Sequence, residues 1–256
     1  MSSRRTRSAV LSGVVSAPDL LKSLCQDCSN HARCTFAEAV EQAPGDPSSR
    51  IMMLRLRHGY ALFHEGTPLI GSYVVCSGLV VQYAAKSGAS VFCVHGNGAS
   101  PDLVDNLMGA SLHRSSAVAI GDAVVAFLPE REAQARSEVL GPNMVNLLRQ
   151  TARQAWILEE RLMHRQVVRS YERVAELFRG MIEASEPASR SEGVFSVPMD
   201  RPLFAKLTGM TPETFSRALT RLQKDGLVAH SKGMLRFPMP AQLCRLTQEG
   251  ALQEGP

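Results

Sequence analysis

Long apolar runs are absent from this 256-residue sequence, and so are the motifs that mark several classes of enzyme. No apolar stretch approaches the roughly 18 residues of a transmembrane helix, which argues against a membrane-spanning protein. The chain has no glycine-rich phosphate loop and no Ser/His/Asp order of a hydrolase. It also lacks internal repeats. We therefore expect a globular protein that is not an enzyme, with enough apolar residues (45%) to bury a core.

The N-terminus carries basic residues followed by the short apolar stretch AVLSGVVSA. Serine and glycine interrupt this stretch, so we interpret residues 1–24 as a flexible basic tail rather than an export signal. Without such a signal we expect a cytoplasmic protein, whose thiols stay reduced. The net charge of +4 and the pI near 8.8 permit nucleic-acid binding but do not require it.

Three of the six cysteines crowd into the segment CQDCSNHARC, residues 25–34. Cys25, Cys28 and Cys34 have the spacing Cys-x2-Cys-x5-Cys, which in a reducing compartment indicates a metal site or a redox switch. Iron–sulfur clusters take four thiolates. Zinc usually takes a second cysteine or histidine pair at a suitable distance, and the sequence has none. A disulfide switch without metal is an alternative.

Residues 51–129 alternate short apolar runs with glycine-containing turns, a texture typical of an all-β sandwich, barrel or roll. From about Glu130 glycine nearly disappears and a helical period begins. We expect this apolar stripe to pair with a second copy of itself in a homodimer, although packing on its own domain is an alternative. The stripe has spacings of three and four, and the expected interface residues are Met144, Leu148, Ala155, Leu158, Glu160 and Leu162.

Residues 201–220, RPLFAKLTGMTPETFSRALT, predict two helices that meet at a sharp turn. The small Ala205 and Gly209 leave room where the helices approach. Thr211 occupies an N-cap position, and Pro212 follows at the first helical position. The segment DGLVAHSKGMLRF that follows predicts a small hairpin. Together these features predict a winged helix-turn-helix, with a helical hairpin carrying solvated charges as the alternative.

The second helix carries Glu213, Ser216 and Arg217 at i, i+3 and i+4, so these side chains project together near its N-terminus. That end of a recognition helix reaches base edges in the major groove. An arginine can donate two hydrogen bonds to guanine, and a glutamate can accept one from a cytosine amino group. We expect Arg221 to suit a phosphate, and we assign Thr211 to the same DNA contact.

A β-rich domain, a long helix and a winged helix-turn-helix, in that order, resemble the CRP/FNR family of bacterial transcription regulators. The segment GMTPETFSRALTRLQKDGLV is similar to that family's recognition segment, where a Glu-x-x-Ser-Arg set contacts the half-site. The resemblance implies an α+β fold with an N-terminal β-roll sensor domain. It also implies homodimers on near-palindromic DNA with TTGAT-like half-sites, and RNA polymerase as a partner if the protein is an activator. The expected domains are the tail at 1–24, the cysteine loop and β-roll at 25–142, the dimerisation and connecting helices at 143–184, and the DNA-binding domain at 185–256.

Within the family, CQDCSNHARC resembles the N-terminal segment of the oxygen-sensing FNR branch. This resemblance implies a [4Fe–4S] cluster on Cys25, Cys28, Cys34 and a fourth cysteine from the β domain. In that branch oxygen degrades the cluster, and the dimer then separates. An acidic residue at about the position of Glu160 belongs to the dimer contact, where two facing carboxylates repel each other.

The chain departs from the branch at the fourth ligand, because the matching stretch GDAVVAFLPE has Ala126 at that position. We take Cys93 as the candidate fourth ligand, because it lies on a predicted strand. A non-cysteine ligand such as His95 is an alternative. Cys76 matches a surface turn, and Cys244 belongs to the DNA-binding domain.

Other sensing modes and another class of activity also remain open. Arg114 and Ser115 echo half of the motif with which cyclic-nucleotide-binding members of the family hold their ligand, but DLV, residues 102–104, takes the place of the glutamate. Candidate haem ligands are His64, His95 and His113. A thiol oxidoreductase built on Cys25 and Cys28 is a further alternative, although no βαβ pattern surrounds them.

Overall fold

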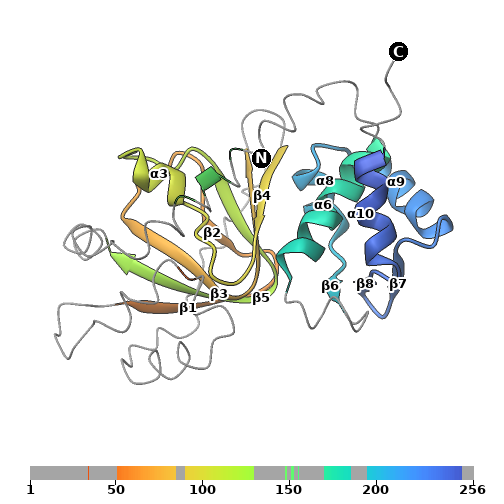
Figure 1. The fold of residues 1–256 in the computed structure, drawn as a ribbon, viewed down its shortest axis with the longest axis horizontal. Coiled ribbons are helices and arrows are strands. Elements are labelled where there is room, and N and C mark those ends of the chain that lie inside the picture. Colours follow the sequence, from red (N-terminus) through yellow and green to blue (C-terminus); the bar gives the residue numbers. More distant parts are fainter. Residues whose placement is uncertain are drawn as a thin grey trace, which may run out of the picture.

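The computed structural model consists of a β-roll packed against a helical domain that carries a small sheet (Figure 1). The described residues are 34, 51–84, 90–129, 148, 151–152, 155, 170–185 and 195–249. Among the described helices, none has both the length and the apolar character needed to cross a membrane. The predicted ligands Cys25 and Cys28 lie outside the described residues.

The β-roll is built from antiparallel strands in the order β1-β5-β3-β4, with β2 also paired to β5. The short helix α3 lies between β4 and β5 in the chain. The two longest strands, β3 and β5, pair with each other in the middle of the sheet. The elements are β1 (Met52–Leu56), β2 (Ala61–Phe63), β3 (Gly71–Ala84), β4 (Ser90–His95), α3 (Leu103–Leu107) and β5 (Ser116–Pro129).

Strand β3 changes the face that its side chains present midway along its length. Tyr73 and Val75 belong to the inner apolar cluster of the roll, and so does Val80. The inward-facing residues are therefore odd-numbered before the middle of the strand and even-numbered after it. The register with β5 shifts on both sides of Ser77, and an extra residue in one strand turns every later side chain to the opposite face. Beyond this irregularity Val81 faces outward and packs against the helical domain.

The helical domain contains four helices among its described residues and the antiparallel sheet β6-β8-β7. Its elements are α6 (Ser170–Ala184), β6 (Ser196–Pro198), α8 (Arg201–Leu207), α9 (Pro212–Lys224), β7 (Ala229–Ser231), β8 (Met234–Arg236) and α10 (Pro240–Glu249). Helices α8 and α9, followed by the β7–β8 hairpin, confirm the predicted winged helix-turn-helix. The α+β class with an N-terminal β-roll is also confirmed.

Local signals explain where α8 and α9 begin. The Asp200 carboxylate accepts a hydrogen bond from the Leu203 N–H at 2.9 Å and caps α8. Thr211 caps α9 as predicted, because its hydroxyl oxygen accepts from the Thr214 N–H at 3.2 Å. Between the helices Gly209 has a φ of 64°, a left-handed conformation that side chains disfavour.

Buried aromatic rings hold the helical domain together. Phe204 on α8 is completely buried and lies with its ring centroid 5.9 Å from that of Phe178 on α6 and 6.0 Å from that of Phe215 on α9. Burying such a side chain contributes about 1.5–3 kcal/mol. These rings fix α9 against its neighbours, so the opposite face of α9 turns to solvent.

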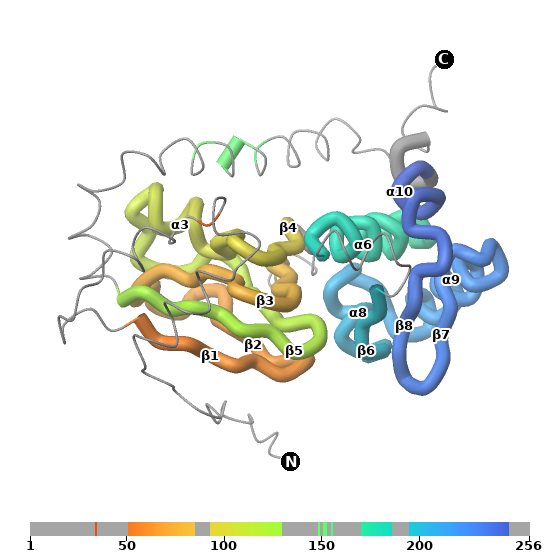
Figure 2. The backbone as a smooth tube through the Cα atoms, turned by 60° about the horizontal axis from the view of Figure 1, so that its bottom comes forward, coloured from red at the N-terminus to blue at the C-terminus, as the bar shows by residue number. Residues whose placement is uncertain are grey.

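The helical domain and the β-roll share one apolar core. Figure 2 shows α6 beside β4, and the two elements are in contact. A Cβ atom on Gly96 would overlap the carbonyl oxygen of Ala184, so the glycine permits this close approach. The ammonium of Lys206 on α8 lies 5.2 Å from the centroid of the Tyr83 ring on β3.

The predicted dimerisation helix is described only at residues 148, 151–152 and 155, all of which are helical. Leu148 exposes 62% of its surface, and Ala155 is also exposed. The other expected interface residues, Met144, Leu158, Glu160 and Leu162, lie outside the described residues.

Candidate nucleic-acid interface

The predicted DNA-contacting residues occupy the first two turns of α9. Glu213 and Arg217 are exposed, and Ser216 is half-buried between them. Phe215 and Leu219, on the opposite side of the helix, are buried. The structure therefore places the three predicted residues on the solvent side of a helix whose other side is fixed in the core.

The side chains at the start of α9 hold one another through short local contacts. The pKa of Glu213 lies below its usual value, because its own backbone N–H and the Thr211 hydroxyl hydrogen-bond to the carboxylate and Arg217 adds a positive charge nearby. The Arg217 guanidinium donates to the Thr214 hydroxyl at 3.5 Å, a long and weak hydrogen bond. An ionised carboxylate and an exposed guanidinium, one turn apart, match the acceptors and donors of base edges.

Arg221 is held differently, by a tyrosine that sequence inspection did not single out. Its guanidinium carbon lies 4.4 Å from the centroid of the Tyr171 ring on α6. The Tyr171 hydroxyl donates to an Asp225 carboxylate oxygen at 3.0 Å, and burial with this hydrogen bond raises the pKa of Tyr171 to about 12. Arg221 thus stays exposed but is anchored at the C-terminal half of α9. No local pattern predicts this contact, because Tyr171 is far away in the sequence.

The described thiols of the β-roll lie at separate places. Cys34 is half-buried. Cys93 on β4 lies opposite Gln82 in the pairing with β3, and its sulfur is 3.6 Å from the carbonyl oxygen of Val94. Cys76 lies within β3 rather than in a surface turn, and it packs against the cluster of Met53 and Ala126. Cys93 lies opposite Gln82, which is six positions along β3 from Cys76, or about 20 Å, so one cluster can take only one of the two thiols.

No group of three metal-ligating side chains comes together within the described part of the chain. The three candidate haem ligands differ in their exposure to solvent. His64 is exposed, whereas His113 is buried and stacks on Phe63 with centroids 4.0 Å apart. His95 is buried, which lowers its pKa to about 4.

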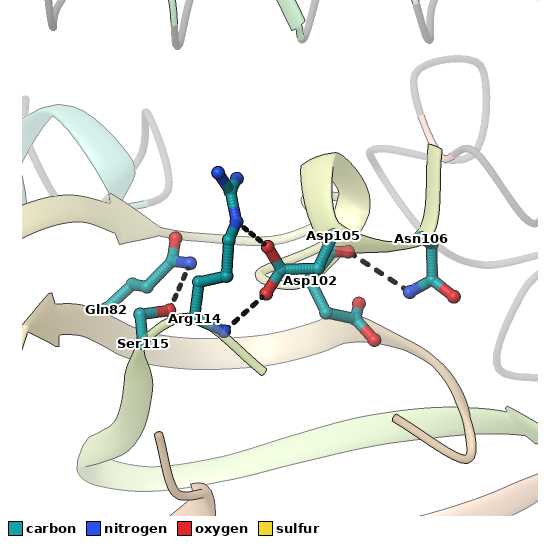
Figure 3. Close-up of polar contacts among 6 residues, drawn as sticks. All are labelled: Gln82, Asp102, Asp105, Asn106, Arg114 and Ser115. Carbon is teal, nitrogen blue, oxygen red and sulfur yellow. Dashed lines mark hydrogen bonds and ion pairs between the residues drawn. The ribbon is translucent and has the colours of Figure 1, made fainter. Parts of the chain in front are cut away.

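The Arg-Ser pair that echoes a cyclic-nucleotide site is engaged by neighbouring side chains (Figure 3). The Nε of Arg114 donates to a buried Asp105 oxygen at 2.7 Å, and its backbone N–H donates to the other oxygen at 3.1 Å. Gln82 donates to the Ser115 hydroxyl at 2.7 Å, and its amide oxygen lies 3.0 Å from Nε2 of His95. Neighbouring side chains therefore already hold the Nε and the backbone N–H of Arg114 and the hydroxyl of Ser115.

A second carboxylate near α3, that of Asp102, is fully buried. One of its oxygens accepts from the Tyr73 N–H at 3.1 Å and from the Ser100 hydroxyl at 3.0 Å. Its other oxygen has no hydrogen-bond partner within the described residues. Burial raises the pKa of Asp102 to about 7, even though these hydrogen bonds act in the opposite direction.

Comparisons with known proteins agree with this geometry. Residues 172–246 match the family model of the Crp-like helix-turn-helix domain. A comparison with curated proteins finds no match. Among solved structures, FixK2 from Bradyrhizobium japonicum is 21% identical, covers 77% of this chain and 96% of its own, and superposes with a TM-score of 0.57.

Two further solved structures have the same fold. The c-di-GMP responsive global regulator CLP from Xanthomonas campestris is 17% identical, with coverage of 73% of this chain and 93% of its own and a TM-score of 0.57. A CRP-family transcriptional regulator from Thermus thermophilus is 20% identical, with coverage of 76% and 96% and a TM-score of 0.53. The chain therefore carries a Crp-like helix-turn-helix domain, and its fold is that of solved CRP/FNR-type regulators.

Proposed function

We propose that this chain is a cytoplasmic transcription regulator that binds DNA as a homodimer and senses oxygen or redox state through its N-terminal cysteines. The observation that carries the DNA-binding part is the outer face of α9. There Glu213 and Arg217 are exposed at the start of a helix that Thr211 caps and the aromatic core holds in place. Such a helix end fits the major groove.

The proposed dimer is supported by exposed apolar residues in the helical segment that precedes the helical domain. Leu148 exposes 62% of its surface, and Ala152 and Ala155 beside it are also exposed. Pairing this stripe with its copy would bury it. Two α9 helices then lie about one helical turn of DNA apart, roughly 34–36 Å, which requires a near-palindromic site. TTGAT-like half-sites are the proposed sequence, with RNA polymerase as a partner if the regulator activates.

The proposed sensor is an iron–sulfur cluster on Cys25, Cys28, Cys34 and one thiol of the β-roll. The donor chemistry fits, because four thiolates suit a [4Fe–4S] cluster and both Cys34 and Cys93 are half-buried thiols. When bound, such a cluster supplies a centre that oxygen destroys. Cys93 is the proposed fourth ligand. Cys76 is its rival, because it packs beside Ala126, the position to which the resemblance assigns the ligand.

The sensor proposal is tested by iron and acid-labile sulfide analysis of protein purified without air. We expect about four iron and four sulfide per chain, near-complete loss in Cys28→Ala and Cys93→Ala, and full retention in Cys244→Ala, the matched control. Loss in Cys76→Ala with retention in Cys93→Ala would move the fourth ligand to Cys76. If the wild-type protein contains no iron and its thiols oxidise to a disulfide, the sensor is a thiol switch and not a cluster.

The DNA-binding proposal is tested separately by fluorescence anisotropy with a near-palindromic TTGAT duplex and a scrambled duplex of the same composition. We expect tighter binding to the palindrome by at least about a thousandfold, the lower end for specific regulators. Equal affinity for the two duplexes would contradict the proposed half-site.

A further inference from the structure

Arg221 continues the row of exposed residues on α9 that begins with Glu213 and Arg217. The three residues are four positions apart, so they share one side of the helix, and all three are exposed. Arg221 lies in the last turn of α9, one turn beyond Arg217. Its side chain therefore stands at the end of the face proposed to enter the major groove, where a phosphate contact would fix the position of the helix.

The residue best placed to occupy this arginine is Asp225. It lies four positions after Arg221, a spacing at which opposite charges on a helix meet. Its backbone N–H donates to the carbonyl oxygen of Arg221 at 3.0 Å and caps the helix, so the two residues are held one turn apart. No ion pair joins their side chains, both of which the structure describes.

Tyr171, in the first turn of α6, contacts both side chains. Its hydroxyl donates to a carboxylate oxygen of Asp225 at 3.0 Å, and the central carbon of the Arg221 guanidinium lies 4.4 Å from the centroid of its ring. Because the pKa of Tyr171 is raised to about 12, the hydroxyl keeps its proton near neutral pH and remains a donor. Tyr171 thus engages the carboxylate with its hydroxyl and the guanidinium with its ring.

This contact leaves the N–H groups of Arg221 for another acceptor. An aromatic ring attracts a guanidinium through the electrons of its face, whereas a carboxylate takes N–H donors. The ring therefore restricts the arginine without using its hydrogen bonds. A phosphate can take two of these donors side by side. A side chain that is ordered before binding also loses less entropy when the complex forms.

We propose that Tyr171 is a positioning residue for DNA binding, which holds Arg221 against its ring and keeps Asp225 from pairing with it. Arg221 is then free to bind a phosphate of the DNA that α9 contacts. This inference rests on the proposed DNA-binding function, and it gives a residue of α6 a part in that function. A phosphate contact carries no base information, so Tyr171 contributes to affinity and not to sequence preference.

The first test is a double-mutant cycle of Tyr171→Leu and Arg221→Ala, measured by fluorescence anisotropy with the TTGAT and scrambled duplexes. Tyr171→Leu alone should weaken binding to both duplexes by about two- to fivefold for each bound protomer, the range of an exposed cation–π contact. Arg221→Ala should make the log–log salt dependence shallower by about 0.9 for each protomer. In protein that carries Arg221→Ala, adding Tyr171→Leu should have no effect, because no guanidinium is left to position.

The second test is a cycle of Tyr171→Phe and Asp225→Asn, which keeps the question open if Tyr171→Leu does not fold. Tyr171→Phe retains the ring but releases the Asp225 carboxylate to pair with Arg221. We expect it to weaken binding by about twofold for each protomer, the strength of such a helix pair. In protein that carries Asp225→Asn it should have no effect, because an amide cannot form the ion pair.

The matched control is Tyr60→Leu, which removes an exposed tyrosine of the β-roll and should leave DNA binding unchanged. Equal losses from Tyr171→Leu with and without Arg221 would overturn the proposal, because Tyr171 would then act on the fold and not on Arg221. Wild-type affinity in both Tyr171→Leu and Tyr171→Phe would overturn it too, and so would wild-type salt dependence in Arg221→Ala. Wild-type protein that binds neither duplex would instead remove the proposed DNA-binding function itself.

Discussion

The outer face of α9 and the polar cluster around α3 contain the same kinds of residue in opposite states. On α9, Arg217 is exposed and has only a weak hydrogen bond to Thr214, and the pKa of the exposed Glu213 is lowered. Around α3, Arg114 is held by the buried Asp105, and the pKa of the buried Asp102 is raised.

The difference indicates which of the two regions is prepared for an external partner. An arginine without a buried carboxylate partner keeps its donors for a ligand, whereas Arg114 already gives its Nε and its backbone N–H to Asp105. The cluster around α3 is held by contacts within the β-roll. The face of α9 is the proposed recognition surface, and the following variants test this division from the largest expected effect to the smallest.

The largest effect should come from the pH dependence that Asp102 imposes. Its pKa rises from 3.8 to about 7 on folding, so the folded protein binds an extra proton between these values. The stabilisation is complete below about pH 4 and is lost as the pH rises through 7. Each unit of such a shift corresponds to about 1.4 kcal/mol. In urea unfolding, Asp102→Asn should lose most of this dependence and exceed the wild type in stability at about pH 8.

Unchanged pH dependence in Asp102→Asn would show that another group controls it. Ser100→Ala is the control, because it removes a hydrogen bond to Asp102 but keeps the carboxylate.

The next largest effect should be a loss of DNA sequence discrimination when Arg217 is removed, with Arg114 as the matched control. Arg217→Ala should reduce discrimination between the TTGAT duplex and a duplex with a changed guanine–cytosine pair by about 1–3 kcal/mol, because a bidentate base contact is lost. Arg114→Ala, on the β-roll, should leave this discrimination unchanged. Competition binding measures both, and equal effects in the two variants would abolish the proposed division.

A smaller effect is expected at the partner of Arg114. Asp105→Ala removes an acceptor from the Arg114 backbone and side chain, but the Arg114 side chain is 65% exposed, so the ion pair itself contributes little. We expect a loss of about 1 kcal/mol in the free energy of unfolding, from the hydrogen bonds alone. Urea unfolding measures it, and specific DNA binding of the folded variant should remain at the wild-type level. A change in its sequence preference would contradict a purely structural role.

The smallest expected effect is that of a cyclic nucleotide on the wild-type protein. Because Asp105 and Gln82 already engage Arg114 and Ser115, cyclic AMP at millimolar concentration should not change the melting temperature. A ligand at about a hundred times its Kd would stabilise the protein by about 2.7 kcal/mol, which differential scanning fluorimetry detects readily. Such a rise in the wild type would reopen the cyclic-nucleotide alternative.

Local patterns were enough to predict the winged helix-turn-helix, because capping and helical spacing act over a few residues. Thr211, Pro212 and the apolar face of α9 are signals of this kind. Contacts between distant segments were not predictable. The Tyr171 ring under Arg221 and the Asp105 carboxylate on Arg114 each join separate elements, and no spacing rule connects them.

The position of Cys76 could not be predicted either, because it depends on how its strand pairs. The resemblance to the family matched Cys76, in VVCSGL, to a surface turn. In the structure these residues form the irregular middle of β3, where the register with β5 shifts. A shift of register depends on the partner strand, so it could not be predicted from β3 alone.

The most direct test of the account is one titration of the TTGAT duplex with a single preparation of protein, purified without air and measured before and after exposure to air. We predict tight binding and iron-containing dimers beforehand, and afterwards a parallel loss of iron, of dimer and of most of the affinity. If the protein carries no iron, or loses its iron and still binds the duplex as dimers with unchanged affinity, then the cysteines do not control DNA binding.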